Sequence, residues 1–421
     1  MIDLNVMGKK LRVGVLFGGR SGEHEVSLVS AASVIQALDP AKYEVVPIGI
    51  TKEGRWILPA LLAPPAPSEV EGSQVVRSGA EGPRSLAEST RRRRTPALTH
   101  SDLRRAFQDA TAVVLPAEPS AASVVPLNPA AKHPEPLHLD VVFPVLHGSF
   151  GEDGTVQGLL ELANLPYIGA GVLGSALGMD KEVQKRLLFQ AKLPVTDFVC
   201  VPRHRWEADR DAVLRTLRRR RRPPVFVKPA NLGSSVGITK VRSASQLAAA
   251  IDLAARYDRK IVVERAIVGR EFEVSVLGNQ EPVASLPGEV IPTNEFYDYA
   301  AKYLQDNTRL IVPARLPQHQ VKRLQELAVA AFRALECAGM ARVDFFLERR
   351  TGKIFINELN TIPGFTAISM YPKLWEASGI PYPELLDRLI QLALDRFREK
   401  ARTRYAVELP GQRGGVLREN D

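Results

Sequence analysis

Two short apolar runs flank one stretch of helical spacing within the first fifty residues, and this order restricts the fold more than any other feature of the sequence. RVGVLFGG at 12–19 and YEVVPIGI at 43–50 predict strands, since both are short and contain β-branched residues. Between them, HEVSLVSAASVIQAL at 24–38 repeats its apolar residues with the period of a helix. This β-α-β order predicts an open α/β sheet.

The apolar runs and the cysteines favour a cytoplasmic protein. No apolar run approaches the length of a membrane span, so we expect no membrane partner. The N-terminal run ends in glycines rather than at a small-residue cleavage site, which favours a first strand over a signal peptide. Cys200 and Cys337 suit neither a disulfide framework nor a metal site, and they fit a reducing compartment.

The net charge of +9 comes from two arginine runs, 91–94 and 218–222, which together equal the whole excess. Such a charge invites comparison with nucleic-acid-binding proteins. Neither run is interleaved with aromatic residues or lies in a nucleic-acid motif. We therefore expect two solvated basic loops and no nucleic-acid partner, with an RNA- or membrane-surface role as the alternative.

A segment rich in Pro, Ala, Ser and Gly at 59–136 interrupts the α/β pattern. Its low hydrophobicity predicts an insertion or mobile loop, partly disordered, with one helix near 101–109. The chain after Arg404 is mostly polar, and we expect it to be disordered.

Regular elements return at 139, with a buried strand at 141–146, a glycine-rich turn and helices at 156–163 and from 179 to about 193. VFVKPA at 225–230 and IVVERAI at 261–267 predict antiparallel strands. FEVSVLG and EPVASL predict a hairpin within 272–286, and a helix is expected at 319–336.

The last two predicted strands carry oxygen ligands on one face. ARVDFFLE places Arg342 and Asp344 two residues apart, and NELN does the same for Glu358 and Asn360. If the turn is TGK at 351–353, the strands form a hairpin on which Asp344, Glu358 and Asn360 converge. Three oxygen ligands suit Mg²⁺ or Mn²⁺, which usually bridges substrate phosphates. The alternative is a set of ordinary charges on a half-buried sheet.

The stretch VKPANLGSSVGITKV at 227–241 is typical of a phosphate-binding loop, although it lacks the G-x-x-x-x-G-K-[ST] spacing. Lys228 ends a strand before a turn of small residues, and Lys181 opens a helix after a glycine-rich bend. Two lysines, N–H groups of a mobile glycine loop and a carboxylate-bound metal could hold a triphosphate from three sides.

Seven stretches together resemble the D-alanine–D-alanine ligases of the ATP-grasp superfamily, in the family's order: FGGRSGEHEVS, LHGSFGEDG, MDK, VFVKPANLGSSVG, EFYDYAAKY, ARVDFF and INELNTIPGFT. The resemblance runs from Arg12 to about Arg396, apart from the insertion. It implies an α/β fold, α+β in the ATP-grasp part, with an N-terminal Rossmann-like open sheet followed by a two-domain ATP-grasp fold. The implied units are a substrate-binding domain at 1–169, a central domain with the phosphate-binding lid at 170–268, a C-terminal domain with the metal site at 269–400, and a polar tail at 401–421.

The resemblance also implies ATP, two Mg²⁺ or Mn²⁺ ions and a homodimer. The nucleotide is implied to contact Lys181, Lys228, Ser235, Gly237, Glu264, Glu271 and Lys302. The lysines and the loop residues would bind phosphates, and Glu264 and Glu271 would contact adenine and ribose. The implied metal ligands are again Asp344, Glu358 and Asn360. Glu271 could instead be a strand-end charge, and Lys302 an ordinary solvated lysine.

The resemblance implies the catalytic residues Glu23, Ser234, Tyr303, Arg342 and Gly364 and the substrate-binding residues His147 and Ser369. Glu23 would take the ammonium of the first D-alanine, with His147 near that substrate and Ser234 and Tyr303 hydrogen-bonded to Glu23. Arg342 and the N–H of Gly364 would stabilise the oxyanion, and Ser369 would bind the second carboxylate. The alternatives are a helix-dipole charge for Glu23, a structural donor for His147, a turn for Gly364 and loop packing for Tyr303.

The reaction implied by the resemblance is ATP-dependent ligation of two D-alanines through an acyl phosphate, for peptidoglycan precursors. Tyr303, in YAAKY, favours an amine nucleophile, because depsipeptide-forming members usually carry His or Phe there. One alternative is a D-alanine–D-lactate ligase on the same scaffold. Another is a nucleotide-binding regulator without turnover, against which the intact Arg342, Asp344, Glu358 and Asn360 set argues.

Overall fold

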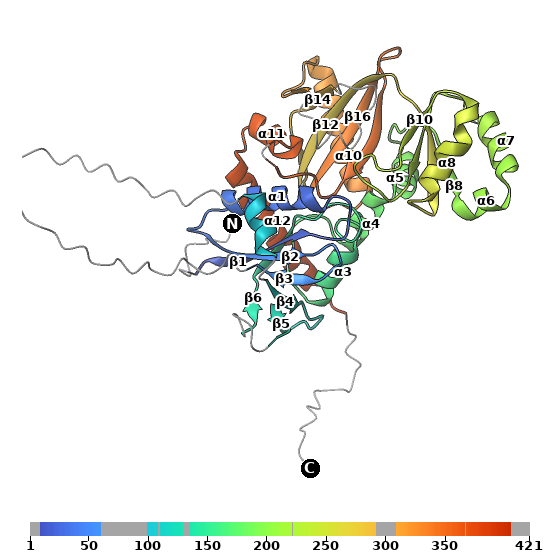
Figure 1. The fold of residues 1–421 in the computed structure, drawn as a ribbon. Helices are drawn as coiled ribbons and strands as arrows, with labels where there is room; N and C mark the ends of the chain where they lie inside the picture. Colours follow the sequence, from blue (N-terminus) through green and yellow to red (C-terminus); the bar gives the residue numbers. More distant parts are fainter. Residues whose placement is uncertain are drawn as a thin grey trace, which may run out of the picture.

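The computed structural model describes residues 9–59, 99–107, 110–128, 135–220, 222–291, 309–366 and 368–405, and these form three sheets (Figure 1). The first sheet contains the predicted β-α-β unit: β1 (Leu11–Gly18), α1 (His24–Ala37) and β2 (Tyr43–Ile50). Strand β1 pairs in parallel with β2 and with β7 (Val141–Pro144). Alternate residues of β1 face different cores, with Val15 and Phe17 on one side and Leu16 on the other. The predicted open α/β sheet is therefore confirmed.

The prediction of a loop is wrong for part of the segment 59–136. After β3 (Trp56–Leu58), the described residues contain α2 (His100–Ala106), β4 (Thr111–Val114) and β5 (Ser123–Pro126), and β6 (Leu137–His138) follows. These strands extend the first sheet in antiparallel order. Val113 and Val124 are buried, and two apolar side chains suffice for such short strands although the segment as a whole is polar. Helix α2 confirms that a helix lies at this place in the chain; residues 60–98, 108–109 and 129–134 lie outside the described ranges.

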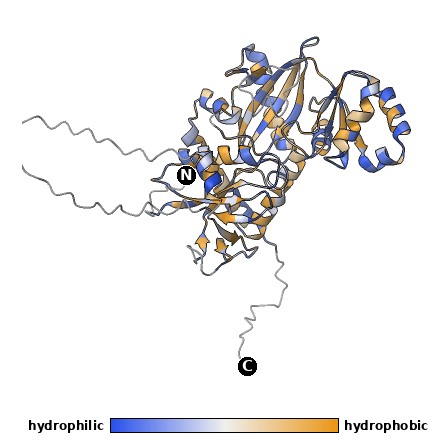
Figure 2. Ribbon diagram, viewed as in Figure 1, coloured by the Kyte–Doolittle hydropathy of each residue, from blue (hydrophilic) through white to orange (hydrophobic). Residues whose placement is uncertain are grey.

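The second sheet has the order β10-β9-β11-β8. Its strands are β8 (Phe198–Pro202), β9 (Val225–Pro229), β10 (Thr239–Val241) and β11 (Lys260–Arg265). The expected antiparallel pairing of β9 with β11 is present, with Val227 opposite Val263. The helical elements of this part are α6 (Arg203–Ala208), α7 (Arg210–Arg220), η3 (Ala244–Gln246) and α8 (Leu247–Ala255). Hydrophilic residues cover much of α7, where Arg218, Arg219 and Arg220 are exposed (Figure 2).

The third sheet holds the predicted final hairpin at its edge, in the order β15-β14-β12-β16-β17 with β13 beside β12. The strands are β12 (Gly269–Gly278), β13 (Val283–Ala284), β14 (Gly288–Ile291), β15 (Arg309–Ile311), β16 (Gly339–Glu348) and β17 (Ile354–Asn360). Helix α10 (Gln318–Ala334) packs Leu324, Leu327 and Ala331 against this sheet. The predicted β12–β13 hairpin is confirmed.

The remaining helices of the described ranges pack against these sheets. They are α3 (Thr155–Leu162), α4 (Val172–Met179), α5 (Lys181–Gln190), α11 (Met370–Ala377) and α12 (Tyr382–Ala401). Helix α12 returns to the first sheet, where Leu385 and Leu389 share a core with Val13 and Phe143. Across the described ranges, none of the helices combines the length and apolar character needed to cross a bilayer.

Candidate functional site

The final hairpin brings the expected oxygen ligands to one face. Asp344 lies opposite Glu358 and Arg342 opposite Asn360 in the β16–β17 register, which shifts at a bulge just after Asp344. Arg342 donates from Nε and Nη2 to the two oxygens of Asp344, at 2.7 Å each. Nδ2 of Asn360 donates to Asp344 at 3.2 Å, which leaves the Asn360 amide oxygen as an acceptor. The predicted convergence of these groups is therefore present.

Arg342 lies among three carboxylates. Glu273 on β12 is the cross-strand neighbour of Asp344, and its Oε2 lies 3.0 Å from Nε of Arg342. Burial acts to lower the pKa of Arg342, but the charges of Asp344, Glu273 and Glu358 raise it well above its usual value. The guanidinium is thus a permanent, oriented cation at the edge of the face that carries Asp344 and Glu358.

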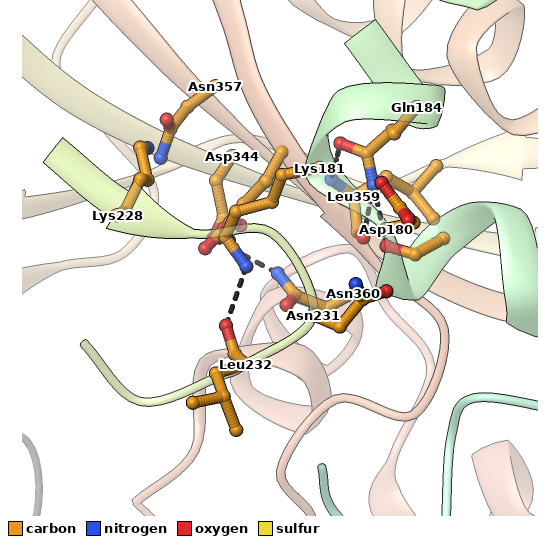
Figure 3. Close-up of polar contacts among 12 residues, drawn as sticks. Asp180, Lys181, Gln184, Lys228, Asn231, Leu232, Asp344, Asn357, Leu359 and Asn360 are labelled. Carbon is orange, nitrogen blue, oxygen red and sulfur yellow. Dashed lines mark hydrogen bonds and ion pairs between the residues drawn. The ribbon is translucent and has the colours of Figure 1, made fainter. Parts of the chain in front are cut away.

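Lys181 reaches the same face from the start of α5. Asp180 accepts hydrogen bonds from the N–H groups of Glu182 and Val183 and so caps this helix. The Lys181 ammonium donates to the carbonyl of Leu232 at 2.7 Å (Figure 3). It also lies 3.4 Å from Oε2 of Glu358. One lysine therefore contacts both the glycine-containing turn and the carboxylate of β17.

Lys228 lies at the end of β9, above a buried carboxylate. Its ammonium forms an ion pair with Glu264 on β11. Burial acts to lower the pKa of Lys228, but Glu264 and then Glu358 raise it. Lys228 is therefore a cation that interacts electrostatically with Glu358 of the β16–β17 hairpin, as the sequence predicts. The carboxylate of Glu264 is held by lysines in this structure, and its implied contact with adenine stays a prediction, as does that of Glu271 with ribose.

The turn after Lys228 has a left-handed backbone that few residue types tolerate. Ser234, Ser235 and Gly237 have φ values of 49°, 59° and 72°. The Ser234 hydroxyl donates to Oε1 of Glu23, 211 residues away in the sequence. A Cβ atom on Gly233 would lie 3.0 Å from Oε2 of Glu23, so a glycine here permits the approach of the two loops.

Glu23 and His147 lie together where β1 and β7 end. Glu23 occupies the N-cap position of α1 without capping it through its side chain. His147 Nδ1 lies 3.1 Å from the carbonyl of Ile362, and burial lowers the pKa of His147, with Glu23 opposing. Glu152 accepts from the N–H of Gly148 at 2.8 Å; burial and then Glu23 raise the pKa of Glu152 to about 8. A cavity of about 170 Å³ opens beside His147, Gly18 and Gly19.

The segment after β17 brings Gly364 and Ser369 together. A Cβ atom on Gly364 would lie 2.9 Å from the Ser369 hydroxyl. Ser369 is at the N-cap position of α11, and its hydroxyl accepts from the N–H of Thr366 at 3.0 Å. Tyr303 and Lys302, the other two expected site residues, lie outside the described residues.

The donor set fits a hard divalent ion. Within the described residues, no three His, Cys, Asp or Glu side chains form a metal cluster. An ion at Asp344 and Glu358 would therefore draw on the Asn360 amide oxygen and on substrate or water oxygens. Mg²⁺ commonly binds in this way, with one or two carboxylates and the phosphates of its substrate.

Sequence reasoning missed four residues around the site: Lys185, Thr196 and Glu273, which contact site residues, and Gln184, which contacts the backbone beside Glu358. Lys185 contacts Glu264, and Thr196 donates to the same carboxylate. Gln184 holds the backbone of Leu359. The spacing of Lys181 and Lys185 on one helical face was the only signal available.

The comparisons with known proteins match the same family over nearly the whole chain. Residues 12–170 match the family model described as D-ala D-ala ligase N-terminus, and residues 187–391 match D-ala D-ala ligase C-terminus. The chain is 50% identical over 398 residues to the D-alanine--D-alanine ligase of Solibacter usitatus, covering 94% of this chain and 99% of that protein. It is 47% identical over 393 residues to that of Heliobacterium modesticaldum, covering 93% and 97%.

Solved structures show the same likeness. The D-alanine-D-alanine ligase from Coxiella burnetii superposes with a TM-score of 0.74 at 37% identity, covering 93% of this chain and 96% of that one. The VanG D-Ala:D-Ser ligase from Enterococcus faecalis superposes with a TM-score of 0.74 at 34% identity, covering 91% and 100%.

Proposed function

The chain belongs to the D-alanine–D-alanine ligase family, and from that premise we propose that it uses ATP to join two D-alanines into D-alanyl-D-alanine for peptidoglycan precursors. The first D-alanine carboxylate takes the γ-phosphoryl group of ATP, and the amine of the second D-alanine attacks the acyl phosphate. Negative charge builds on the transferring phosphoryl group and then on a tetrahedral oxyanion. Fixed cations and N–H donors at those positions lower both barriers.

The observation that carries this proposal is the contact of Lys181 with Glu358 and with the turn at Leu232. The Lys181 ammonium lies within one side-chain length of both the Glu358 carboxylate, the proposed metal ligand, and the glycine-containing turn, the proposed phosphate loop. Lys181 and Lys228 bind ATP phosphates in this proposal, and Ser235 and Gly237 belong to the loop that closes over them. Glu264, Glu271 and Lys302 contact the nucleotide.

Asp344, Glu358 and Asn360 are the proposed ligands of two Mg²⁺ or Mn²⁺ ions, which when bound neutralise charge on the phosphates. Arg342 and the N–H of Gly364 stabilise the oxyanion. Three N–H groups of Arg342 remain beyond those that contact described carboxylates, so the side chain can hold Asp344 and donate to substrate together.

Glu23 binds the ammonium of the first D-alanine beside His147, and Ser369 binds the carboxylate of the second. The Ser234–Glu23 hydrogen bond supports this assignment, because it joins the phosphate loop to the substrate loop. Tyr303 is proposed to join this pair when the loop containing it covers the site.

The proposed units are 1–169 for substrate, 170–268 and 269–400 for ATP and metal, and a tail at 401–421. We place the protein in the cytoplasm as a homodimer, following the family. Its two free cysteines, Cys200 and Cys337, fit a reducing compartment.

Product analysis tests the proposal. The protein is mixed with ATP, Mg²⁺ and D-alanine, and ADP release and dipeptide mass are followed, with L-alanine, D-lactate and D-serine as competitors. The expected result is D-alanine-dependent ADP release with D-alanyl-D-alanine as main product at neutral pH. ADP release that does not depend on D-alanine, or a depsipeptide as the main product, would contradict the proposal.

A further inference from the structure

Lys185 is a buried lysine that cannot itself bind the nucleotide. Its side chain is 1% exposed and lies one helical turn after Lys181 on the same face of α5. Its ammonium contacts the Thr196 hydroxyl at 3.0 Å, the carbonyl of Asn357 at 3.2 Å and Oε2 of Glu264 at 3.0 Å. An ammonium has three N–H groups, so these contacts occupy all of them.

Glu264 is divided between two lysines. Its Oε1 pairs with Lys228, and its Oε2 with Lys185 and with the Thr196 hydroxyl at 3.2 Å. Despite burial, Lys185 and Lys228 hold the pKa of Glu264 down to about 2, so the group is ionised. Burial lowers the pKa of Lys185, and the Glu264 carboxylate beside it opposes that shift. With both lysines protonated, the buried cluster of Lys185, Lys228 and Glu264 carries one net positive charge.

Lys185 also fixes the strand that carries Glu358. It holds the carbonyl of Asn357, and Gln184 holds the backbone of Leu359 through hydrogen bonds of 3.1 and 3.0 Å (Figure 3). Asn357 and Leu359 flank Glu358 in β17. Lys185 and Gln184 thus hold the backbone on both sides of Glu358, the proposed metal ligand.

We propose that Lys185 is a positioning residue. By pairing with Oε2 of Glu264, it leaves Lys228 only one oxygen of that carboxylate, Oε1, so that the ammonium of Lys228 stays available to the nucleotide phosphates. Without Lys185, the pair of Lys228 and Glu264 would be neutral, and both carboxylate oxygens would draw the ammonium toward the core. A neutral pair attracts a polyphosphate far less than a net cation does. This inference rests on the nucleotide-binding role proposed for Lys228.

Nucleotide affinity of Lys185→Met tests this inference. The variant removes the charge and keeps most of the length, and the ligand is ADP with Mg²⁺, measured by titration calorimetry without turnover. We expect a loss of ADP affinity of about tenfold or more, a similar rise in KM for ATP, and a change of less than about threefold in KM for D-alanine. Lys322→Met, an exposed lysine on α10, is the matched control and should change none of these.

A double-mutant cycle with Glu264→Gln separates positioning from general support of the fold. Once Glu264 is neutral it no longer draws Lys228 inward, so adding Lys185→Met should then cost less than about threefold in ADP affinity. Equal losses in both backgrounds, or equal rises in KM for ATP and for D-alanine, would overturn the inference. If the methionine variant does not fold, Lys185→Gln takes its place with the same expected losses.

The outcomes keep the two proposals apart. A wild-type protein that binds ADP but forms no dipeptide would contradict the proposed function, and the affinity ratios would still decide the role of Lys185. A wild-type protein that does not bind ADP would overturn both.

Discussion

Replacing Arg342 with lysine keeps its charge and removes its geometry. The guanidinium donates two parallel hydrogen bonds of 2.7 Å to Asp344 and approaches Glu273 at 3.0 Å, with a side chain 18% exposed. A lysine ammonium can replace at most one of the parallel bonds, because it lacks the planar fork. Arg342→Lys therefore tests whether the site needs an oriented donor or only a positive charge.

The expected loss has two parts. One charge-assisted hydrogen bond contributes about 1.5–3 kcal/mol, so Asp344 becomes less firmly held beside Glu358. Losing an oxyanion donor lowers kcat by about a hundredfold to a thousandfold. We expect kcat to fall by at least about a hundredfold, while KM for ATP changes by less than about fivefold because the lysines that bind phosphate are untouched.

Steady-state kinetics with ADP release as the signal measures both constants. Arg388→Lys is the matched control, since Arg388 pairs with Glu384 on the exposed surface of α12, and such pairs contribute little. Circular dichroism confirms that each variant is folded. A kcat for Arg342→Lys within about fivefold of wild type would refute the reasoning, because charge alone would then suffice.

Three further predictions concern other parts of the site. Ser234→Ala removes a charge-assisted hydrogen bond to Glu23 and should lower kcat/KM for D-alanine by about 10- to 150-fold, whereas exposed Ser243→Ala should not. Excess chelator should abolish ADP release, and added Mg²⁺ should restore it. Asp344→Asn should raise the Mg²⁺ concentration needed for half-maximal rate by about tenfold or more. An unchanged Mg²⁺ concentration at half-maximal rate would exclude Asp344 as a ligand. Burial and Glu23 raise the pKa of Glu152 from 4.5 to about 8. Between these two pH values the folded protein holds a proton that the unfolded chain has released. The free energy of unfolding therefore falls as pH rises from about 4.5 to about 8. Glu152→Gln keeps the acceptor for Gly148 and should raise the melting temperature relative to wild type at pH near 8, and less so near 5; the opposite trend would contradict the assignment.

Local patterns predicted those parts of the protein that depend on neighbours in the chain. Strand periodicity placed Arg342 with Asp344 and Glu358 with Asn360 on single faces, and the register confirms the hairpin. Short β-branched runs identified β1, β2, β9 and β11, and helical spacing identified α1. These signals failed for β4 and β5, because a short strand with one buried apolar side chain carries too little signal against a polar background.

Apart from short strands such as β4 and β5, the amino-acid sequence by itself determined which backbone segments become strands and helices and which face their side chains occupy, since both follow from residues two to four positions apart. Only the tertiary structure decided that Ser234 meets Glu23 across 211 residues, that Lys185 shares Glu264 with Lys228, and that α12 returns to the first sheet. Such contacts depend on how whole elements pack to bury apolar surface, and the polar groups that meet there must then satisfy one another. No local spacing encodes that meeting, because the partners become neighbours only once the sheets have assembled.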